Sequence, residues 1–160
     1  MHKSSLKLME EVFIKRFLNR PGSTILDVGA LDVNGTYRHL FKDYLYTGAD
    51  LQPGRNVDIV LPHPYEWNVG QYDVVISGQV LEHVEDTAAF MRAVRDALKP
   101  GGITCHIVPW RWHEHRYPID CWRIFPDGMS WLFRNSQLIE VLTSSDKVGN
   151  TIGIARKPLE

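Results

Sequence analysis

Cysteine is scarce in this sequence, and long apolar runs are missing from it. Cys105 and Cys121 are the only cysteines among the 160 residues. Two cysteines are too few for a disulfide framework, and their spacing is not that of a zinc site. No apolar run approaches the ~18 residues that a membrane-spanning helix needs, and residues 1–20 lack the apolar core of a signal peptide. We therefore expect reduced thiols, a cytoplasmic location and no membrane partner.

An excess of charge of either sign is also absent. Lysine and arginine number 18 and aspartate and glutamate 19, which gives a formal net charge of −1. Such a chain has no general electrostatic attraction to nucleic acid, so a nucleic-acid partner is not expected. A local basic group nevertheless stands at Arg111, His113, His115, Arg116 and Arg123. The composition is that of an ordinary globular protein, and the length fits one domain over residues 1–160.

What the sequence does contain is an alternation of short apolar runs and amphipathic segments. The short runs predict strands at residues 24–28, 44–49, 57–60, 72–77, 103–108, 138–143 and 151–155. Periodic apolar positions predict helices at residues 6–18, 36–41 and 86–98, with a helical turn at 130–133. Strands that alternate with helices form mostly parallel sheets with both faces covered. The fold class that we expect is α/β, a Rossmann-like doubly wound sheet in a single domain.

The ends of the first two strands carry residues that are typical of a ligand site. Gly29 follows the first strand and lets the backbone approach a ligand, and amides at the start of the next helix could receive an anion. Asp50 closes the second strand, where a carboxylate can accept hydrogen bonds from both hydroxyls of a ribose. A plain turn and a solvated carboxylate are the alternatives. The dinucleotide pattern G-x-G-x-x-G is absent, since Ala30 and Leu31 follow Gly29, and this disfavours a nicotinamide dehydrogenase.

Three segments resemble the class I S-adenosylmethionine-dependent methyltransferases, in particular the methyltransferase-11-like group. They are ILDVG at 25–29, YTGADL at 46–51 and YDVVISGQVLEHV at 72–84, which runs on through a helix to LKPGG at 98–102. Together with the last two strands, the resemblance covers roughly residues 23–157. It implies a seven-stranded sheet whose last strand, residues 151–155, is antiparallel. It also implies an enzyme that uses S-adenosylmethionine.

The resemblance assigns seven residues to the cofactor. They are Asp27, Gly29 and Ala30 at its methionine end, Asp50 at the ribose, Leu51 at the adenine, and Gln79 and Val80 at the sulfonium. The chain departs from the family in two places. Its first loop holds fewer glycines than usual, and Leu61, Pro62 and His63 stand where an acidic residue often follows the third strand.

Residues 109–128 form a long loop that we expect on the acceptor side. Its core, H-x-x-P-x-D-x-W-R-x-x-P-x-G, is similar to a loop in members of this group that are encoded near polysaccharide biosynthesis genes, which suggests a glycan. His115 paired with Asp120 could act as a base toward a hydroxyl, and Arg123 could hold an anionic group. Rings that could stack on a sugar stand at Trp110, Trp112 and Trp122. The alternative is a loop whose polar groups only pair among themselves.

We predict a methyltransferase that acts on a hydroxyl of a small molecule or glycan, with a homodimer as one option. His113, Glu114 and His115 suggest a metal, but a His-x-His pattern without further clustered ligands is weak, and we expect no metal site. His83, beside Glu82 at the start of a helix, is expected to be structural or part of a pocket wall. Two other functions stay open: a non-catalytic cofactor-binding or partner module with the same fold, and a nicotinamide oxidoreductase.

Overall fold

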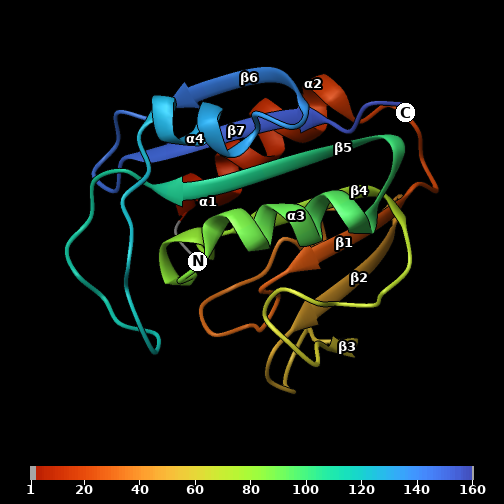
Figure 1. Ribbon diagram of the computed structural model, residues 1–160, viewed down its shortest axis with the longest axis horizontal. Coiled ribbons are helices and arrows are strands. Elements are labelled where there is room, and N and C mark those ends of the chain that lie inside the picture. Colours follow the sequence, from red (N-terminus) through yellow and green to blue (C-terminus); the bar gives the residue numbers. More distant parts are fainter. Residues whose placement is uncertain (1–2, 160) are drawn as a thin grey trace.

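Seven strands form one sheet in the computed structural model, which describes residues 3–159 (Figure 1). Met1, His2 and Glu160, at the ends of the expected domain, lie outside the described residues. Across the sheet the strands follow the order β3-β2-β1-β4-β5-β7-β6. Their bounds are Thr24–Val28 (β1), Leu45–Asp50 (β2), Ile59–Val60 (β3), Tyr72–Gly78 (β4), Leu98–Pro109 (β5), Gln137–Thr143 (β6) and Asn150–Arg156 (β7).

The directions of the strands confirm the predicted fold class. Strands β1 to β5 pair in parallel, whereas β7 is antiparallel to both of its neighbours, β5 and β6. The sequence predicts each strand within a few residues, except that β5 begins at Leu98, which pairs with Tyr72. The mostly parallel Rossmann-like sheet with an antiparallel last strand is thus the observed architecture. Its parallel strands end at one common edge.

Helices cover both faces of the sheet. The N-terminal helix consists of α1 (Lys3–Leu8), a π-helical stretch (Met9–Ile14) and α2 (Lys15–Phe17), while α3 spans Thr87–Ala97 and α4 spans Pro126–Leu132. The N-terminal helix packs on one face, and α3 and α4 pack on the other (Figure 1). Within residues 3–159, none of the helices is both long enough and apolar enough to cross a membrane.

Alternate residues of the buried strands supply the cores on the two faces, because side chains of a strand point to opposite sides in turn. In β1, Ile25 packs in the core under the N-terminal helix, and its neighbour Leu26 packs in the core under α3 and α4. The predicted apolar stripe of the N-terminal helix contains Met9 and either Val12 or Phe13. Met9 and Phe13 are fully buried, whereas Val12 is only partly so.

The helix predicted at residues 36–41 is present but shorter than expected. A single 3₁₀ turn, Arg38–Leu40, is found there. The Arg38 side chain donates from Nε to Asn56 Oδ1 at 2.5 Å and forms an ion pair with Asp58. A segment this short cannot propagate a helix against such competing contacts.

The helical turn predicted at residues 130–133 is longer and begins earlier. It is α4, which starts at Pro126, a residue type that favours the first helical position because its φ is already helical. The long loop therefore ends at residue 125 and not at residue 128. Met129 and Leu132 of α4 are buried against the sheet.

A buried histidine joins β4 to β5. His106 is fully buried, and its Nδ1 and Nε2 lie 2.7 Å from Ser77 Oγ and 2.8 Å from Thr104 Oγ1. Burial lowers the pKa of His106 to about 3, so the ring is neutral near pH 7. Because both ring nitrogens have partners within the sheet, we regard this histidine as structural.

Strand β7 leaves no room for a methyl group at Gly153, where α4 crosses it. A Cβ there would lie 2.5 Å from Met129 Cγ and 2.6 Å from Phe133 Cε2. We expect Gly153→Ala to lower the free energy of unfolding by about 1–3 kcal/mol in urea denaturation, the usual effect of overpacking. Gly128→Ala in α4 is the matched control, because its Cβ would meet Ile124 Cγ2 at 3.4 Å and alanine favours a helix by up to ~1 kcal/mol. Equal effects of the two substitutions would contradict this packing.

Candidate active site

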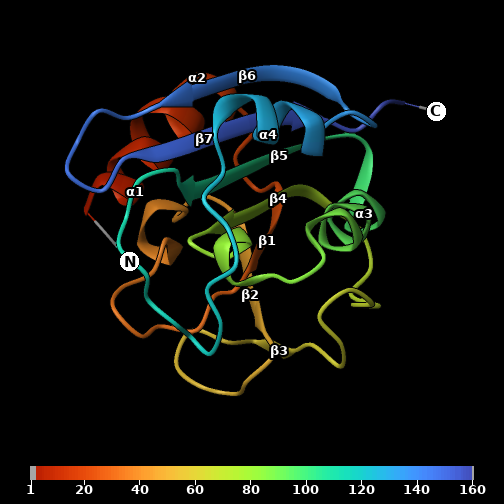
Figure 2. The same cartoon turned by 60° about the vertical axis from the view of Figure 1, so that its left-hand side comes forward.

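A pocket of about 600 Å³ opens at the edge of the sheet where β1, β2 and β4 end. Small-molecule sites typically measure about 300–1,000 Å³, and open α/β sheets bind ligands at this edge. The loop of residues 110–125, which follows β5, lies over the same edge (Figure 2). Residues lining the pocket include Gly29, Leu31, Asp50, Leu51, Leu61, Tyr65, Gln79, Val80, His83, Phe90, His115, Arg116, Tyr117, Pro118 and Ile119.

Gly29 forms the turn after β1. Its φ of +80° is one that L side chains rarely adopt, and a Cβ there would lie 2.3 Å from Val80 Cγ2. The amides of Gly29 and Ala30 both donate to the carbonyl of Ala49, at 2.8 and 3.0 Å, and in this fully described stretch no α-helix follows before β2. The expectation that helix amides receive an anion here is therefore wrong. Gly29 lines the pocket, whereas Ala30 is buried beside it and does not.

Asp50 and Leu51 lie on the pocket wall at the end of β2. The Asp50 carboxylate accepts the backbone N–H groups of Leu31 and Gln52, both at 3.1 Å. Two carboxylate oxygens offer about four acceptor positions, so capacity remains for the hydroxyls of a ligand. Leu51 is half-exposed and adds an apolar surface next to this carboxylate.

Asp27 lies beneath the first turn and not on the pocket wall. It is 2% exposed, it accepts a hydrogen bond from the Tyr46 hydroxyl, and it is absent from the residues that line the pocket. Burial raises the pKa of Asp27 to about 7, against the opposing effect of the Tyr46 hydrogen bond. The resemblance implies that Asp27 helps to hold both the loop and the amino group of the cofactor. Its buried position suits support of the loop from inside, and Asp27 is not among the residues that line the pocket.

Gln79 and Val80 follow β4 and both line the pocket. The backbone of Gln79 is left-handed, with φ +61°, an uncommon conformation for a residue with a side chain. Its side-chain amide donates to Asn150 Oδ1 at 2.9 Å. Val80 contacts the turn at Gly29. Backbone strain of this type is concentrated at functional sites.

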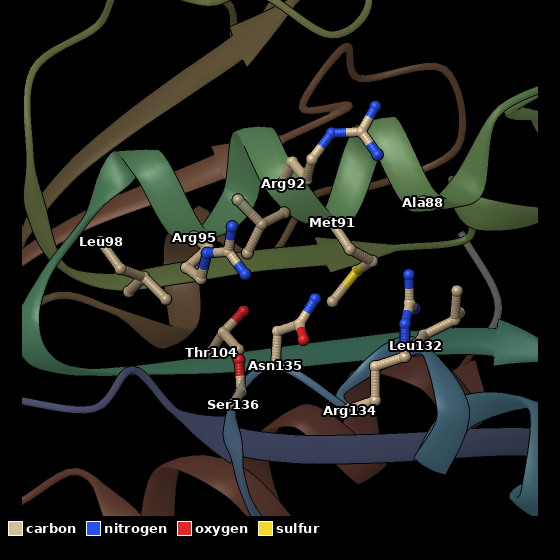
Figure 3. Close-up of a pocket in the computed structure, with 11 residues that line it drawn as sticks. Ala88, Met91, Arg92, Arg95, Leu98, Thr104, Leu132, Arg134, Asn135 and Ser136 are labelled. Atoms are coloured by element: carbon tan, nitrogen blue, oxygen red, sulfur yellow. The ribbon is translucent and has the colours of Figure 1, made fainter.

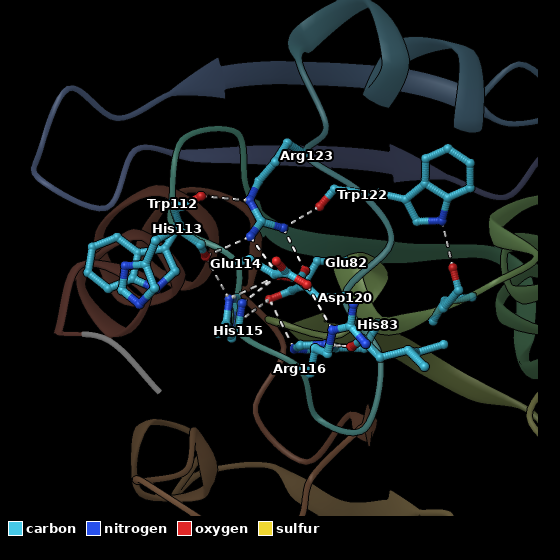
Figure 4. Close-up of polar contacts among 12 residues, drawn as sticks. Glu82, His83, Trp112, His113, Glu114, His115, Arg116, Asp120, Trp122 and Arg123 are labelled. Atoms are coloured by element: carbon cyan, nitrogen blue, oxygen red, sulfur yellow. Dashed lines mark hydrogen bonds and ion pairs between the residues drawn. The ribbon is translucent and has the colours of Figure 1, made fainter.

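Hydrogen bonds fasten the loop of residues 110–125 to the segment that follows β4. The Glu82 carbonyl accepts the backbone N–H groups of Cys121 at 2.6 Å and Trp122 at 3.2 Å. The His83 ring lies with Nδ1 2.5 Å from the Ile119 carbonyl (Figure 4). These contacts hold the middle of the loop against the pocket.

Of the three residues that the sequence assigns to catalysis, only His115 lines the pocket. Asp120 binds Arg123 through two hydrogen bonds of 2.7 and 2.8 Å, and these bonds hold the pKa of Asp120 well below its usual range. Asp120 also accepts the backbone N–H of His115 at 2.7 Å. The imidazole of His115 has Nδ1 3.5 Å from Asp120 Oδ2 and 3.2 Å from the His113 carbonyl, which is its hydrogen-bond partner. Asp120 therefore orients the backbone of His115 and not its ring.

Two further expectations for the loop are not met. Arg123 donates to the carbonyls of Trp112 and His113 as well as to Asp120. Its guanidinium is therefore hydrogen-bonded within the loop and is not placed to bind an anion in the pocket. None of the three loop tryptophans lines the pocket. Trp110, for example, packs against Phe125 with ring centroids 5.9 Å apart.

Glu82 has the most unusual environment among the acidic groups near the pocket. Its side chain is fully buried, and within the described residues neither carboxylate oxygen has a hydrogen-bond partner. Burial raises the pKa of Glu82 to about 8 and lowers the pKa of His83. The Nε2 atoms of His83 and His115 lie 3.7 and 3.9 Å from Glu82 Oε1. The sequence makes Glu82 and His83 neighbours, but nothing in it indicates that His115 reaches them.

A smaller hollow lies between α3, β5 and the turn after α4 (Figure 3). It measures about 80 Å³, well below the ~300 Å³ of small-molecule sites. Arg92, Arg95 and Arg134 are among its lining residues. The pocket at the strand ends is therefore the candidate active site.

Comparison with known families identifies the family of this domain. A family model described as a methyltransferase domain matches residues 7–146. The chain belongs to this methyltransferase family. The match confirms the resemblance to S-adenosylmethionine-dependent methyltransferases that the motifs at 25–29, 46–51 and 72–84 indicate.

Curated relatives match only parts of the chain. The 2-methyl-6-phytyl-1,4-hydroquinone methyltransferase of Synechocystis sp. is 30% identical over 119 residues, which are 64% of this chain and 37% of that protein. The ubiquinone biosynthesis O-methyltransferase of Ruegeria pomeroyi is 52% identical over 33 residues, 21% of this chain and 13% of that protein. The chain thus spans well under half the length of these relatives.

Solved structures share the fold at low sequence identity. The 1,6-didemethyltoxoflavin-N1-methyltransferase of Burkholderia thailandensis, solved with 1,6-didemethyltoxoflavin and S-adenosylhomocysteine, gives a TM-score of 0.76 at 16% identity. The match covers 98% of this chain and 79% of that one. A putative methyltransferase of Bacillus halodurans gives a TM-score of 0.74 at 12% identity, with 97% and 99% covered.

The raised pKa of Asp27 makes the stability of the fold depend on pH. The native carboxyl is protonated up to about pH 7, whereas the unfolded one loses its proton near pH 4. The native state therefore binds more protons in this range, and stability falls as the pH rises from about 4 to 7. We expect Asp27→Asn to remove about 2–4 kcal/mol of the loss in unfolding free energy between about pH 4 and 7. Urea denaturation at several pH values measures this. The exposed Asp96→Asn is the control, and equal slopes in both variants would refute the buried-acid assignment.

Proposed function

We propose that this protein transfers the methyl group of S-adenosylmethionine to a hydroxyl group of a small molecule. The observation that carries the proposal is the convergence of three strand ends on one pocket. Gly29, Asp50 and Gln79 follow or end β1, β2 and β4, and His115 faces them from the loop after β5. Family membership supports the reaction class, and this pocket is the place that we assign to it.

We assign the cofactor to the wall formed by β1 and β2. Gly29 leaves space for the amino-acid part of the cofactor, and Asp50 has acceptor capacity left for the two ribose hydroxyls. Leu51 and Leu61 offer apolar surfaces to the adenine. Val80, next to Gln79, would border the sulfonium. Along this wall the glycine, the carboxylate and the leucines thus stand in the same order as the amino acid, the ribose and the adenine of the cofactor.

We assign the acceptor to the wall formed by His83, His115 and Ile119. Imidazoles set among apolar side chains suit a hydroxyl on an apolar or aromatic skeleton. The names of two relatives support this class of acceptor: a 2-methyl-6-phytyl-1,4-hydroquinone methyltransferase and a ubiquinone biosynthesis O-methyltransferase. We prefer it to a glycan, because the loop tryptophans that would stack on a sugar are not part of the pocket lining.

The reaction is an in-line displacement. The acceptor oxygen bonds to the methyl carbon while the carbon–sulfur bond breaks and its electrons stay on sulfur, which leaves S-adenosylhomocysteine, a methyl ether and a proton. When bound, the cofactor supplies an activated methyl group. The protein must align the reactants and ease the loss of the hydroxyl proton. We propose that His115 acts at that hydroxyl, and that Asp120 and Arg123 are positioning residues that fix its loop.

We further propose a cytoplasmic enzyme, in keeping with the free thiols of Cys105 and Cys121. The competing proposal is a non-catalytic module that holds the cofactor for a partner. Such a module would bind S-adenosylhomocysteine and methylate no acceptor.

Replacing Asp50 tests the cofactor wall. We expect Asp50→Ala to weaken the binding of S-adenosylhomocysteine by about 1–3 kcal/mol in isothermal titration, because a pair of hydroxyls loses its charged acceptor. Asp50→Asn, which keeps an oxygen for the Leu31 amide, should show a smaller loss with the same sign. The exposed Asp96→Ala serves as the control. Unchanged affinity in both Asp50 variants would rule out the ribose contact.

Replacing His115 tests the acceptor wall. With a panel of phenols and hydroquinones, we expect the wild type to release S-adenosylhomocysteine. We expect His115→Ala to slow that release by about 10²-fold or more, the usual size of assistance to proton transfer, with unchanged affinity for S-adenosylhomocysteine. His113→Ala, two residues away in the same loop, should keep wild-type rates. Full activity of His115→Ala would remove this residue from the mechanism.

A further inference from the structure

One carboxylate and two imidazoles meet at the wall of the pocket. Glu82 and His83 follow β4, and His115 comes from the distant loop after β5 (Figure 4). One ligand-type atom from each of these side chains lies within 4.8 Å of the other two. The Nε2 atoms of the two histidines are 3.7 and 3.9 Å from Glu82 Oε1, too far for hydrogen bonds. Three potential ligands therefore converge on a point that none of them fills.

Glu82 needs a partner that the described residues do not give it. Its side chain is fully buried, and neither oxygen accepts a hydrogen bond within residues 3–159. Buried carboxylates in native proteins are normally hydrogen-bonded, paired with a cation or bound to a metal. The guanidinium of Arg123, close in the same cluster, is bound to Asp120 through both of its terminal nitrogens. A cation held at Glu82 would supply the missing charge.

Both histidines are held in the way that metal-binding histidines are held. Nδ1 of His83 faces the Ile119 carbonyl at 2.5 Å, and Nδ1 of His115 faces the His113 carbonyl at 3.2 Å. In a neutral ring whose Nδ1 faces a carbonyl, Nδ1 carries the hydrogen and Nε2 keeps its lone pair. Metal-bound histidines commonly donate their other N–H to a carbonyl or carboxylate, which fixes the ring. In this site the Nε2 atoms of both histidines lie next to the Glu82 carboxylate.

We propose that Glu82, His83 and His115 bind a divalent transition-metal ion such as Zn²⁺. Two nitrogens and one oxygen suit Zn²⁺ and its neighbours in the first transition series, whereas Mg²⁺ and Ca²⁺ prefer oxygen alone. Zn²⁺ lies about 2.0–2.2 Å from such ligands, so the three atoms would need to close in by less than ~1 Å each. His83 and His115 line the pocket, and the remaining coordination positions would face it.

This inference rests on the proposed function and deepens it. A metal ion at the pocket wall would bind the acceptor hydroxyl and lower its pKa. The hydroxyl proton would pass to water. The oxygen would then form a bond to the methyl carbon while the carbon–sulfur bond breaks and its electrons stay on sulfur. His115 would act on the acceptor through the ion and not as a base. The preferred acceptors would carry a second oxygen beside the hydroxyl, as in a catechol, because two oxygens can fill two open positions.

Titration of the chelator-treated protein with Zn²⁺ tests the site directly. We expect one ion per chain with a micromolar or lower Kd, and a visible absorption band when Co²⁺ is used instead. His115→Ala and Glu82→Gln should each weaken Zn²⁺ binding by at least ~10-fold. His113→Ala, a histidine of the same loop outside the cluster, is the matched control and should bind as the wild type does.

Titration of the same samples with S-adenosylhomocysteine separates the two proposals. If the wild type binds S-adenosylhomocysteine but not Zn²⁺, or if both cluster variants keep the wild-type affinity for Zn²⁺, the metal site is refuted and methyl transfer still stands. If Zn²⁺ binds and S-adenosylhomocysteine does not, the proposed function fails and the site survives. Because Glu82 is buried, its variant can misfold, but His115 lies on a partly exposed loop and its variant keeps the test decisive.

Discussion

The carbonyl oxygen of Glu82 receives two amides from the loop after β5, those of Cys121 and Trp122. Residues 110–125 contain no regular helix or strand, and loops of this length in a compact domain are usually functional or disordered. The two hydrogen bonds, together with the contact of the His83 ring with the Ile119 carbonyl, hold the loop against the end of β4. Only because the loop is held there does His115 face the pocket. Without these contacts His115 and Ile119 would leave the pocket, and only His83 of the proposed acceptor wall would remain.

The same docking creates the electrostatic character of the acceptor wall. The Glu82 side chain is fully buried beside the docked loop, whose own charged pair, Asp120 and Arg123, is joined by two hydrogen bonds. The carboxylate of Glu82 is thus buried without a counter-ion, and burial opposes its charged form. The two imidazoles next to it do not relieve that cost by hydrogen bonding, because their Nε2 atoms are 3.7 and 3.9 Å away. We expect the Glu82 carboxylate to bind a ligand, because a buried carboxylate with a purely structural role normally has hydrogen-bond donors around it.

Local periodicity was enough to predict the sheet, because strands such as β1 and β4 are buried on both faces and read as apolar runs. It also placed Gly29 and Asp50 at strand ends, and hence at the pocket. Local periodicity could not predict which hydrogen-bond partner a group takes when several lie within reach in the folded chain. Ala49 takes the amides of the first turn, and Arg123, not the His115 ring, takes the Asp120 carboxylate. The meeting of Glu82 with His115 likewise depends on how a long loop docks, which no local pattern encodes.

The two walls of the pocket differ in how they are held, and this difference fits the roles that we propose for them. The proposed cofactor wall stands on β1 and β2, and together with β4 these strands have their backbone groups locked in a parallel ladder between two cores. The proposed acceptor wall stands largely on a loop whose middle is fastened by a handful of hydrogen bonds to the segment that follows β4. Loops tolerate substitution far better than the strands that carry them. A change in residues 110–125 can therefore alter which acceptor fits while the cofactor wall is preserved, and a common fold can host many acceptors in this way.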